Sequence, residues 1–383
     1  MIYLYYSDRF SEYNFGPHHP LRPVRLALAY RLMEDYGLLD EGDVQVVEPP
    51  LASELELLSV HTPEYLEAVR SEMPNILFGL GIGDNPVFEG IYDASRLVAG
   101  GSIDAARRIA EEGCVAFNFA GGLHHAMPDR ASGFCIFNDP ALAIRTLRRK
   151  FGRVLYIDID AHHGDGVQKV FYDDPRVLTV SIHESGRHLF PGTGFVDELG
   201  EETGFGYSVN IPLPPGSGDR EYERAFEAIV PPLFEAFRPE VVVSQLGADA
   251  HYADPLADLN LTLSGYGRLV SRIGELKDQY AEGRLLALGG GGYNLGVVPV
   301  SWAAALQIMK GEEVREYLPP FWAELFKNEV GGSPLCPPDR GPVNEVQEDG
   351  GRRRRISEDL DRTLGDLRAR LAEVHPRFRI IDR

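Results

Sequence analysis

The sequence predicts an α/β fold, with a mostly parallel sheet and helices on both faces. Short runs of β-forming residues alternate along the chain with longer stretches of helical period, the pattern of consecutive βαβ units. Four of these runs lead into glycine-marked turns, and residues suited to chemistry lie beside those turns, where open parallel sheets place their ligands. A chain of 383 residues is long enough for one large α/β domain.

Four apolar runs are expected to be buried strands, because they are short, rich in β-forming residues and bounded by glycine. They lie at 115–119, 154–157, 241–247 and 284–288. Five stretches carry a helical period and are expected to cover the sheet: 22–36, 91–111, 140–150, 222–237 and 266–280.

The segments outside these elements are expected to be loops and a tail. Stretches rich in glycine and proline at 74–86, 184–194 and 212–219 predict long surface loops, which are commonly functional. Residues 331–355 predict an extended segment. Residues 356–373 then show a helical period, with Ser357 as the expected N-cap. We expect this terminal helix to pack back on the domain or to mediate association.

The net charge of the chain indicates which kinds of binding partner to expect. The chain has 38 basic and 58 acidic residues, a formal charge of −20. This balance argues against nucleic acid as a partner and is compatible with basic proteins or cationic substrates. The four arginines at 352–355 are interpreted as a solvated charge run.

Other sequence features indicate a cytoplasmic protein without a membrane partner. No apolar run approaches the length of a membrane span, and the N-terminus lacks the pattern of a signal peptide. Cys114, Cys135 and Cys336 show no CxxC spacing, so they are expected to be reduced thiols. Cys135 is interpreted as a small buried side chain.

The stretch RVLYIDIDAHHGDG at 153–166 places five ionisable residues directly after a strand. Asp160 and His162 are two residues apart, so their side chains can reach one point, and a pair of oxygen and nitrogen ligands suits a divalent transition metal. The other strand ends carry matching chemistry. They present His124 and His125, Asp249, and Tyr293 after four glycines.

These motifs carry a family resemblance. GGLHHA, GFCIFND, DIDAHHGDG, FPGTG, LGAD and GGGGYN occur here in the order found in the zinc-dependent histone deacetylase superfamily. The wording GADAHYADPL at 247–256 resembles the bacterial acetoin utilisation (AcuC) type. The resemblance covers residues 15–310 and implies the arginase–deacetylase fold with an eight-stranded sheet. It predicts a deacetylase domain at 1–330 and a C-terminal extension, with its terminal helix, at 331–383.

The resemblance implies a metal site formed by Asp160, His162 and Asp249. Catalytic zinc uses three protein ligands and keeps positions open for water and substrate. Two carboxylates and one imidazole also make Fe²⁺ credible. Such a metal polarises an amide carbonyl and lowers the pKa of bound water to about 7.

Two histidines are expected to handle protons. The family pattern pairs His124 with Asp158 and His125 with Asp165. By the resemblance His125 is the general acid/base, and His124 acts mainly through its charge. Tyr293 is expected to donate a hydrogen bond to the developing oxyanion, since the glycines before it let the backbone approach a ligand closely.

Further residues are expected to contact the substrate. Family counterparts of 133–134 and 189–190 form the walls of a narrow tunnel for an acyl-lysine stem. Asp84 matches a rim carboxylate, Leu256 a rim position that tunes substrate choice, and Arg25 a buried arginine near the base of the site. The expected substrate contacts are Asp84, Gly133, Phe134, Phe190, Leu256 and Gly291.

The family also carries a monovalent cation, usually K⁺, beside the catalytic metal. The matching positions for its inner site are Asp158, Asp160, His162, Ser181 and Ile182. A second, outer site maps to Phe171, Asp174, Val177 and Tyr207.

One position departs from the pattern. His251 lies two residues after Asp249, where many deacetylases have an apolar residue and arginases have a second metal-binding Asp. It is interpreted as a rim or surface residue, with a second-metal ligand as the alternative.

The sequence therefore predicts a metal-dependent lysine deacetylase acting on acetylated proteins or peptides, with metabolic enzymes as candidate substrates. Three alternatives stay open. A deacetylase of acetylpolyamines or other small amides is disfavoured by the apolar Leu256. An arginase-type ureohydrolase needs the paired Asp pattern that His251 interrupts. An inactive acetyl-lysine reader predicts a missing catalytic residue, and none is missing. The oligomeric state is left open.

Overall fold

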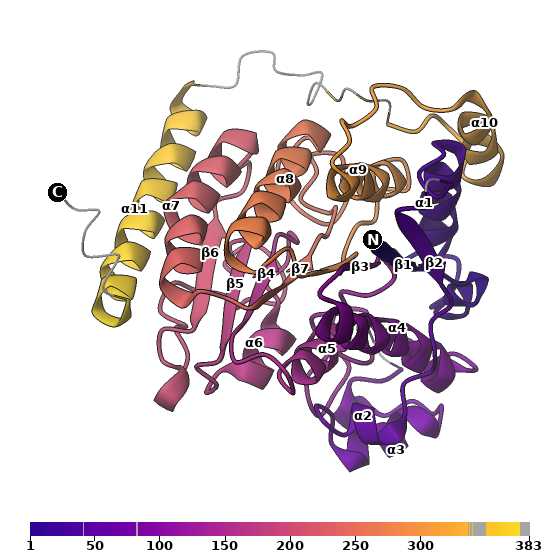
Figure 1. Cartoon of the computed structure of the whole chain (residues 1–383), viewed down its shortest axis with the longest axis horizontal. Helices are drawn as coiled ribbons and strands as arrows, with labels where there is room; N and C mark the ends of the chain where they lie inside the picture. The colour runs from indigo at the N-terminus through magenta and orange to yellow at the C-terminus, as the bar shows by residue number, and fades with distance from the viewer. Residues whose placement is uncertain (41, 82, 336, 338, 340–349, 376–383) are drawn as a thin grey trace.

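A parallel sheet of eight strands forms the centre of the described structure, in the order β2-β1-β3-β8-β7-β4-β5-β6 (Figure 1). The structure is a computed structural model, and it describes residues 1–40, 42–81, 83–335, 337, 339 and 350–375. Every strand pair is parallel, as the alternation of strands and helices predicts. The strands are β1 (Ile2–Tyr5), β2 (Val44–Val47), β3 (Val115–Asn118), β4 (Val154–Asp158), β5 (Val177–Glu184), β6 (Ser208–Leu213), β7 (Val241–Gln245) and β8 (Leu285–Leu288).

Helices cover both faces of this sheet, so the predicted layering is confirmed (Figure 1). One face packs against α4, α5 and α6. The other packs mainly against α1, α7, α8 and α9. The helices are α1 (Val24–Asp35), α2 (Glu54–Leu57), α3 (Pro63–Arg70), α4 (Ile91–Glu112), α5 (Asp139–Leu147), α6 (Asp165–Phe171), α7 (Asp219–Phe237), α8 (Leu263–Tyr280), α9 (Val298–Lys310), α10 (Pro320–Glu329) and α11 (Gly350–Val374).

The strand pattern explains why both faces are buried. In β4 the Tyr156 side chain packs in one hydrophobic cluster, and its neighbours Leu155 and Ile157 pack in the other. Successive side chains of a strand point to opposite faces, so a fully apolar strand needs a helix layer on each side. The ends of β3, β4, β7 and β8 lie next to one another, and this order brings their loops together.

The terminal helix begins earlier than the sequence indicated, so Ser357 as its N-cap is wrong. α11 begins at Gly350, and Ser357 lies inside it, where its hydroxyl oxygen accepts a hydrogen bond from Arg224 Nη1 (2.9 Å). Arg224 also pairs with Asp361. The helix packs back on α7 and buries one apolar face, formed by Ile356, Leu360, Leu364, Leu367 and Leu371. Because this apolar stripe and the long straight-chain arginines favour a helix, the end of the expected extended segment is helical as well.

Two smaller corrections concern boundaries. The expected loops at 184–194 and 212–219 begin inside strands, because β5 runs to Glu184 and β6 to Leu213. The expected helix at 140–150 ends at Leu147. Cys336, residue 338 and residues 340–349 of the expected extended segment lie outside the described residues.

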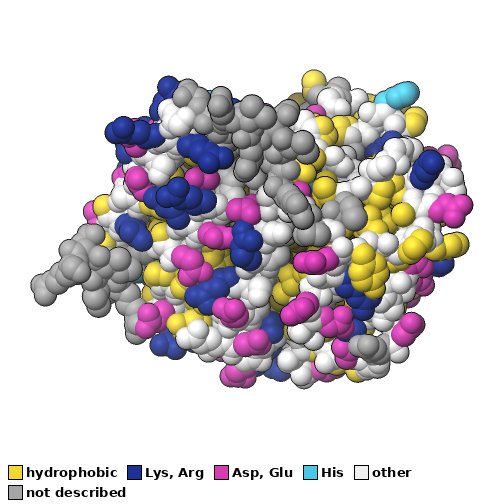
Figure 2. Space-filling view, turned by 90° about the horizontal axis from the view of Figure 1, so that it is seen from above, with side chains coloured by type: hydrophobic (Ala, Val, Ile, Leu, Met, Phe, Trp, Pro, Cys, Tyr) yellow, Lys and Arg dark blue, Asp and Glu magenta, His cyan; other side chains and the backbone are white. Residues whose placement is uncertain are grey.

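The surface carries mixed charges. Figure 2 shows Lys and Arg side chains interspersed with Asp and Glu on one face of the molecule. Residues 352–355 are exposed in the first turns of α11, and Arg354 pairs with Glu358 (2.7 Å). Within the described residues, no helix has both the length and the apolarity to cross a membrane.

Candidate active site

Three side chains suited to holding a metal meet beyond the ends of β4 and β7. Asp160 and His162 follow β4, and Asp249 follows the neighbouring strand β7. Their ligand atoms all lie within 4.8 Å of one another, and all three residues are buried. His162 Nδ1 is 3.2 Å from Asp160 Oδ1 and 3.0 Å from Asp249 Oδ2. The structure thus brings together the three residues that the sequence suggested as ligands.

The electrostatics of this cluster fit a divalent cation. Burial alone would lower the pKa of His162, but hydrogen bonds to Asp160 and Asp249 raise it to about 10. Burial, with the nearby charge of Asp160, raises the pKa of Asp249 to about 7. The two buried carboxylates raise the pKa of the imidazole beside them, and the same negative charge would favour a bound cation. Two carboxylates and an imidazole are the donors that zinc or ferrous iron takes in such sites.

Backbone and side-chain donors orient the two carboxylates. Asp160 Oδ2 accepts hydrogen bonds from Gln245 Nε2 (2.6 Å) and from the Gly291 N–H (2.8 Å). Asp249 Oδ1 accepts one from the Ala161 N–H (2.8 Å). Such contacts fix the direction of the ligand atoms. Sequence reasoning missed Gln245, although a polar residue at the buried end of the run VVVSQ was a signal for it.

His124 and His125 lie beside this cluster, each held by its own carboxylate. His124 Nδ1 is 2.7 Å from Asp158 Oδ2, and His125 Nδ1 is 2.7 Å from Asp165 Oδ1. These are the pairings that the family pattern implied. Tyr156, which sequence reasoning missed, donates its hydroxyl to Asp158 Oδ2 (2.6 Å).

The two histidines have opposite pKa shifts. Burial lowers the pKa of His124, but the charges of Asp158 and Asp160 outweigh it and raise the value to about 9. Burial, reinforced by the charge of His124, lowers the pKa of His125 to about 4. His125 is therefore neutral and able to accept a proton near neutral pH, while His124 is a cation.

Two residues of the GFCIFND motif hold the histidine loop in place, a role that sequence reasoning missed. Asp139 Oδ1 accepts hydrogen bonds from the N–H groups of Gly122 (3.0 Å) and Leu123 (2.8 Å). Asn138 Nδ2 donates to the carbonyl of His124 (3.2 Å). Both side chains are fully buried, so their polar atoms need these partners.

Tyr293 faces the metal cluster. Its ring centroid lies 6.4 Å from that of His162 and 5.6 Å from that of Phe134. Burial raises the pKa of Tyr293 well above its ordinary value, so the phenol keeps its proton. Arg25, buried as expected, donates through Nη1 to the carbonyls of Gly290 (2.9 Å) and Gly292 (3.0 Å).

The expected wall residues line a narrow space above the cluster. The Phe190 ring lies 5.0 Å from the His125 ring, centroid to centroid. A Cβ at Gly133 would lie 2.6 Å from His125 Cδ2 and 2.8 Å from Phe190 Cε1, so only glycine fits between these rings. A Cβ at Gly291 would lie 2.0 Å from Asp249 Oδ2. Both glycines therefore belong to the tightest part of the site.

The expected rim residues lie farther out. Asp84 is exposed, and its backbone carbonyl is 3.2 Å from His19 Nε2. Leu256 is half-buried in the loop after β7. Cys135 is buried as expected, and burial raises the pKa of its thiol above the ordinary value.

The residues expected at the two monovalent-cation sites fall into two places. Asp158 of β4 pairs in register with Ser181 of β5, so the inner set lies beside the metal cluster. In the outer set Val177 begins β5, and its N–H donates to the Asp174 carbonyl (3.1 Å). These residues therefore lie at the amino ends of the strands, opposite the metal cluster. Cation binding at either place stays a prediction.

His251 is not a surface residue, which corrects that interpretation. It is buried, and its Nε2 is 2.8 Å from Asp339 Oδ2. Asp339 also accepts the Tyr252 hydroxyl (3.0 Å) and the Leu263 N–H (3.1 Å). Among the described residues His251 is not part of the three-residue metal cluster. Its partner, 88 positions away along the chain, was invisible in the local sequence.

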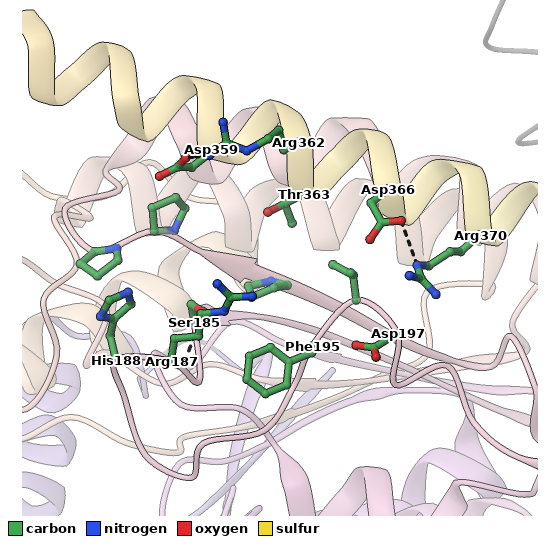
Figure 3. Close-up of a pocket in the computed structure, with 14 residues that line it drawn as sticks. Ser185, Arg187, His188, Phe195, Asp197, Asp359, Arg362, Thr363, Asp366 and Arg370 are labelled. Atoms are coloured by element: carbon green, nitrogen blue, oxygen red, sulfur yellow. Dashed lines mark hydrogen bonds and ion pairs between the residues drawn. The ribbon is translucent and has the colours of Figure 1, made fainter.

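A larger cavity, of about 770 Å³, lies between α11 and the loops after β5 and β6 (Figure 3). Acidic and basic side chains alternate along its helical wall and pair with one another, as Asp366 does with Arg370 (3.0 Å). The space beside the histidines and Tyr293 is only about 10 Å³. Chemistry rather than size therefore identifies the candidate site, because the buried ligand cluster and the oriented histidines lie in the smaller space.

Comparisons with known proteins give matches over most of the chain. The model of the histone deacetylase domain matches residues 19–309. The acetoin utilization protein AcuC of Bacillus subtilis is 44% identical over 83% of this chain and 84% of its own. AcuC of Staphylococcus aureus is 39% identical over 84% and 85%. The solved structure of a histone deacetylase homologue from Aquifex aeolicus superposes with a TM-score of 0.82 at 33% identity, covering 95% of this chain and 99% of its own. A solved homologue complexed with SAHA gives 0.83, with the same identity and coverage.

Proposed function

This chain belongs to the histone deacetylase family, and from that premise we propose that it hydrolyses the acetyl amide of N-ε-acetyl-lysine in proteins. One observation carries the proposal. A buried cluster of metal-type ligands faces two histidines, each oriented by a carboxylate, and a protonated tyrosine. Amide hydrolysis needs an activated water, a proton carrier and a donor for the oxyanion, and these groups supply all three.

The proton steps fall to His125. It is neutral in the resting site, so it accepts a proton from the attacking water and later delivers it to the leaving amine. Asp165 holds the imidazole by Nδ1, so the proton is exchanged at Nε2, which lies 3.0 Å from Nε2 of His124. His124 stays charged and stabilises the negative charge that develops.

Asp160, His162 and Asp249 would hold Zn²⁺ or Fe²⁺, which would act as a Lewis acid on the carbonyl and lower the pKa of water. Tyr293 donates a hydrogen bond from its phenol to the carbonyl oxygen as that oxygen gains charge. Loss of one such donor typically costs about 10²–10³-fold in kcat. We also propose that K⁺ binds the inner set that includes Asp158 and Ser181.

The narrow walls favour a long, slender acyl-lysine stem. Phe134 and Phe190 present apolar rings beside His125 and Tyr293, as the methylene chain of lysine requires. Leu256 offers no charge for a polyamine ammonium, while Asp84 is exposed where a rim carboxylate would hold the peptide backbone. The substrates would be acetylated proteins, among them metabolic enzymes of the kind that the relatives' name suggests.

A direct comparison of substrates tests the proposal. The protein, loaded with zinc or with ferrous iron under anaerobic conditions, is assayed on acetyl-lysine peptides, acetylated protein, N-acetylputrescine and N-acetylspermidine. We expect kcat/KM on the peptides to exceed that on the acetylpolyamines by at least about tenfold, which is the discrimination expected from roughly 1.4 kcal/mol. The opposite ratio would assign a polyamine substrate, and turnover of arginine alone would overturn the deacetylase assignment.

A further inference from the structure

We propose that Asp254 is a positioning residue for the reaction, because it fixes the peptide unit that carries Tyr293. The inference rests on the proposed role of Tyr293 as oxyanion donor. Asp254 Oδ2 accepts the Tyr293 N–H (2.8 Å) and, more weakly, the Asn294 N–H (3.3 Å). Asp254 is 7% exposed, so these are partly desolvated, charge-assisted hydrogen bonds.

The peptide bond between Gly292 and Tyr293 is held from both ends. Its carbonyl oxygen accepts from Arg25 Nη1 (3.0 Å), and its N–H donates to Asp254 (2.8 Å). A cation at the oxygen and an anion at the N–H both favour the same orientation of the peptide dipole. This orientation sets the direction of the Tyr293 Cα–Cβ bond and hence where the phenol can reach.

The Tyr293 peptide needs these two hydrogen bonds because the segment before it has little conformational restriction of its own. It consists of four glycines, and Gly292 has φ +140°, a conformation that residues with a Cβ rarely adopt. A Cβ there would also lie 2.6 Å from Val298 Cγ2. Glycines therefore admit the required turn but do not hold it, and external hydrogen bonds have to do so.

The other oxygen of Asp254 links the same side chain to the rim. Oδ1 accepts the Leu256 N–H (3.0 Å), so one carboxylate connects the oxyanion donor with the residue expected to tune substrate choice. Asn294 Nδ2 adds a parallel hydrogen bond to the Ala253 carbonyl (2.7 Å). The loop after β7 and the loop after β8 are thus joined by several hydrogen bonds next to the site.

The loop that carries Asp254 is itself anchored. The Ala253 N–H donates to His251 Nδ1 (3.1 Å), and His251 Nε2 is 2.8 Å from Asp339. These contacts give the carboxylate a fixed base against which to hold Tyr293. Among the described residues Asp254 is outside the three-residue metal cluster, but its charge also acts on Asp249 and His162, so an effect through Tyr293 has to be separated from one on metal binding.

A double-mutant cycle tests this coupling on the full-length, metal-loaded protein. Asp254→Asn keeps the shape of the side chain but removes its charge. The amide has a single acceptor oxygen, so it cannot accept from all the N–H groups that the carboxylate accepts from. We expect kcat on an acetyl-lysine peptide to fall by roughly 10- to 100-fold, the range for losing a hydrogen bond to a charged group, with KM changed less than about threefold. In a Tyr293→Phe background the same substitution should cost under about twofold, because the donor that it positions is already gone.

Equal losses in both backgrounds, or a change confined to KM, would overturn the proposal. Asp258→Asn is the matched control, since Asp258 lies in the same loop with an exposed side chain, and it should leave kcat unchanged. Metal content and the melting temperature are measured for every variant. If Asp254→Asn melts below the assay temperature, Asp254→Glu is used in its place. It keeps the charge but moves the acceptor, and its loss of kcat should again be much smaller in the Tyr293→Phe background than in the unmodified protein.

Failure of the proposed function gives a different result. In that case the unmodified protein turns over no acetyl-lysine peptide, and the cycle is run on whichever acetylated amine it does hydrolyse. Coupling between Asp254 and Tyr293 on that amide would support the positioning role, and additivity there would remove it.

Discussion

The Nε2 atoms of His124 and His125 lie 3.0 Å apart, although each imidazole is oriented by a different carboxylate. Two cations at this distance would repel strongly, so one ring holds a proton at the expense of the other. The surroundings decide which of the two rings is charged. Asp158 and Asp160 favour the charge on His124, and burial beside that charge keeps His125 neutral.

His125→Ala should nearly abolish turnover and leave the metal bound, because this histidine carries protons and is not a ligand. The expected loss is about 10²–10⁴-fold in kcat. Steady-state kinetics check the loss of turnover, and elemental analysis after dialysis checks that the metal stays bound. His18→Ala, at an exposed histidine, should change neither quantity. Full activity of the His125 variant would show that another group is the base.

Tyr293→Phe should lower kcat by roughly 10²–10³-fold while the affinity for an acetylated peptide stays nearly intact. The carbonyl oxygen gains charge only as the tetrahedral intermediate forms, so the phenol matters most there. Single-turnover rates and equilibrium binding separate the two effects. Collapse of affinity with an unchanged rate per bound substrate would make Tyr293 a pocket wall only.

Activity should decline at alkaline pH as His124 loses its proton near pH 9, because the charge of His124 is expected to stabilise the negative charge that develops in the reaction. Asp158 raises the pKa of His124, so Asp158→Asn should lower that pKa and move the alkaline limb to lower pH. The pH profile of kcat for the two proteins, each shown to retain metal, is the measurement. An alkaline limb that stays in place would assign it to another group.

Metal binding should release protons, because His162 must be neutral to act as a ligand and its pKa in the metal-free protein is about 10. At pH 8 we expect about one proton per bound ion, and toward pH 6 a second from Asp249, whose pKa is about 7. Apparent affinity therefore rises with pH over this range. Titration calorimetry in buffers of different ionisation enthalpy counts the protons. Binding without proton release would show that His162 is already neutral.

Gly133→Ala should impair catalysis more than folding, because the added Cβ would meet both His125 and Phe190 within 3 Å, at a residue with φ +50°. We expect a large loss of kcat/KM with metal content unchanged. Gly274→Ala is the matched control. It lies in α8 with nothing within 4 Å of the new Cβ, and it should preserve activity and stabilise the protein by up to about 1 kcal/mol. Equal behaviour of the two variants would contradict the tunnel geometry.

Local sequence was enough to predict the α/β layers, and it offered candidate residues for the site. The strands are short and apolar on both faces, so their sequence alone requires helices above and below. Each group of candidate residues directly follows a strand, and parallel strands end at one edge of the sheet. Asp160 and His162 could therefore be placed together from their spacing after one strand, and the family resemblance added Asp249. The start of the terminal helix could not be predicted from local sequence, because α11 is stabilised by burial of its leucines on α7 rather than by a cap at Ser357.

By itself, the sequence determined the fold class, the family and the chemistry-bearing side chains, because these depend on periodicity and on motifs within single segments. Only the tertiary structure decided how those side chains are held. Gln245 on Asp160, Asp254 on the Tyr293 peptide and Asp339 on His251 join segments that are far apart in the chain. The physical reason is burial. A polar group that leaves water takes whichever partner the packing brings near, and that partner is chosen by strand order rather than by neighbouring residues.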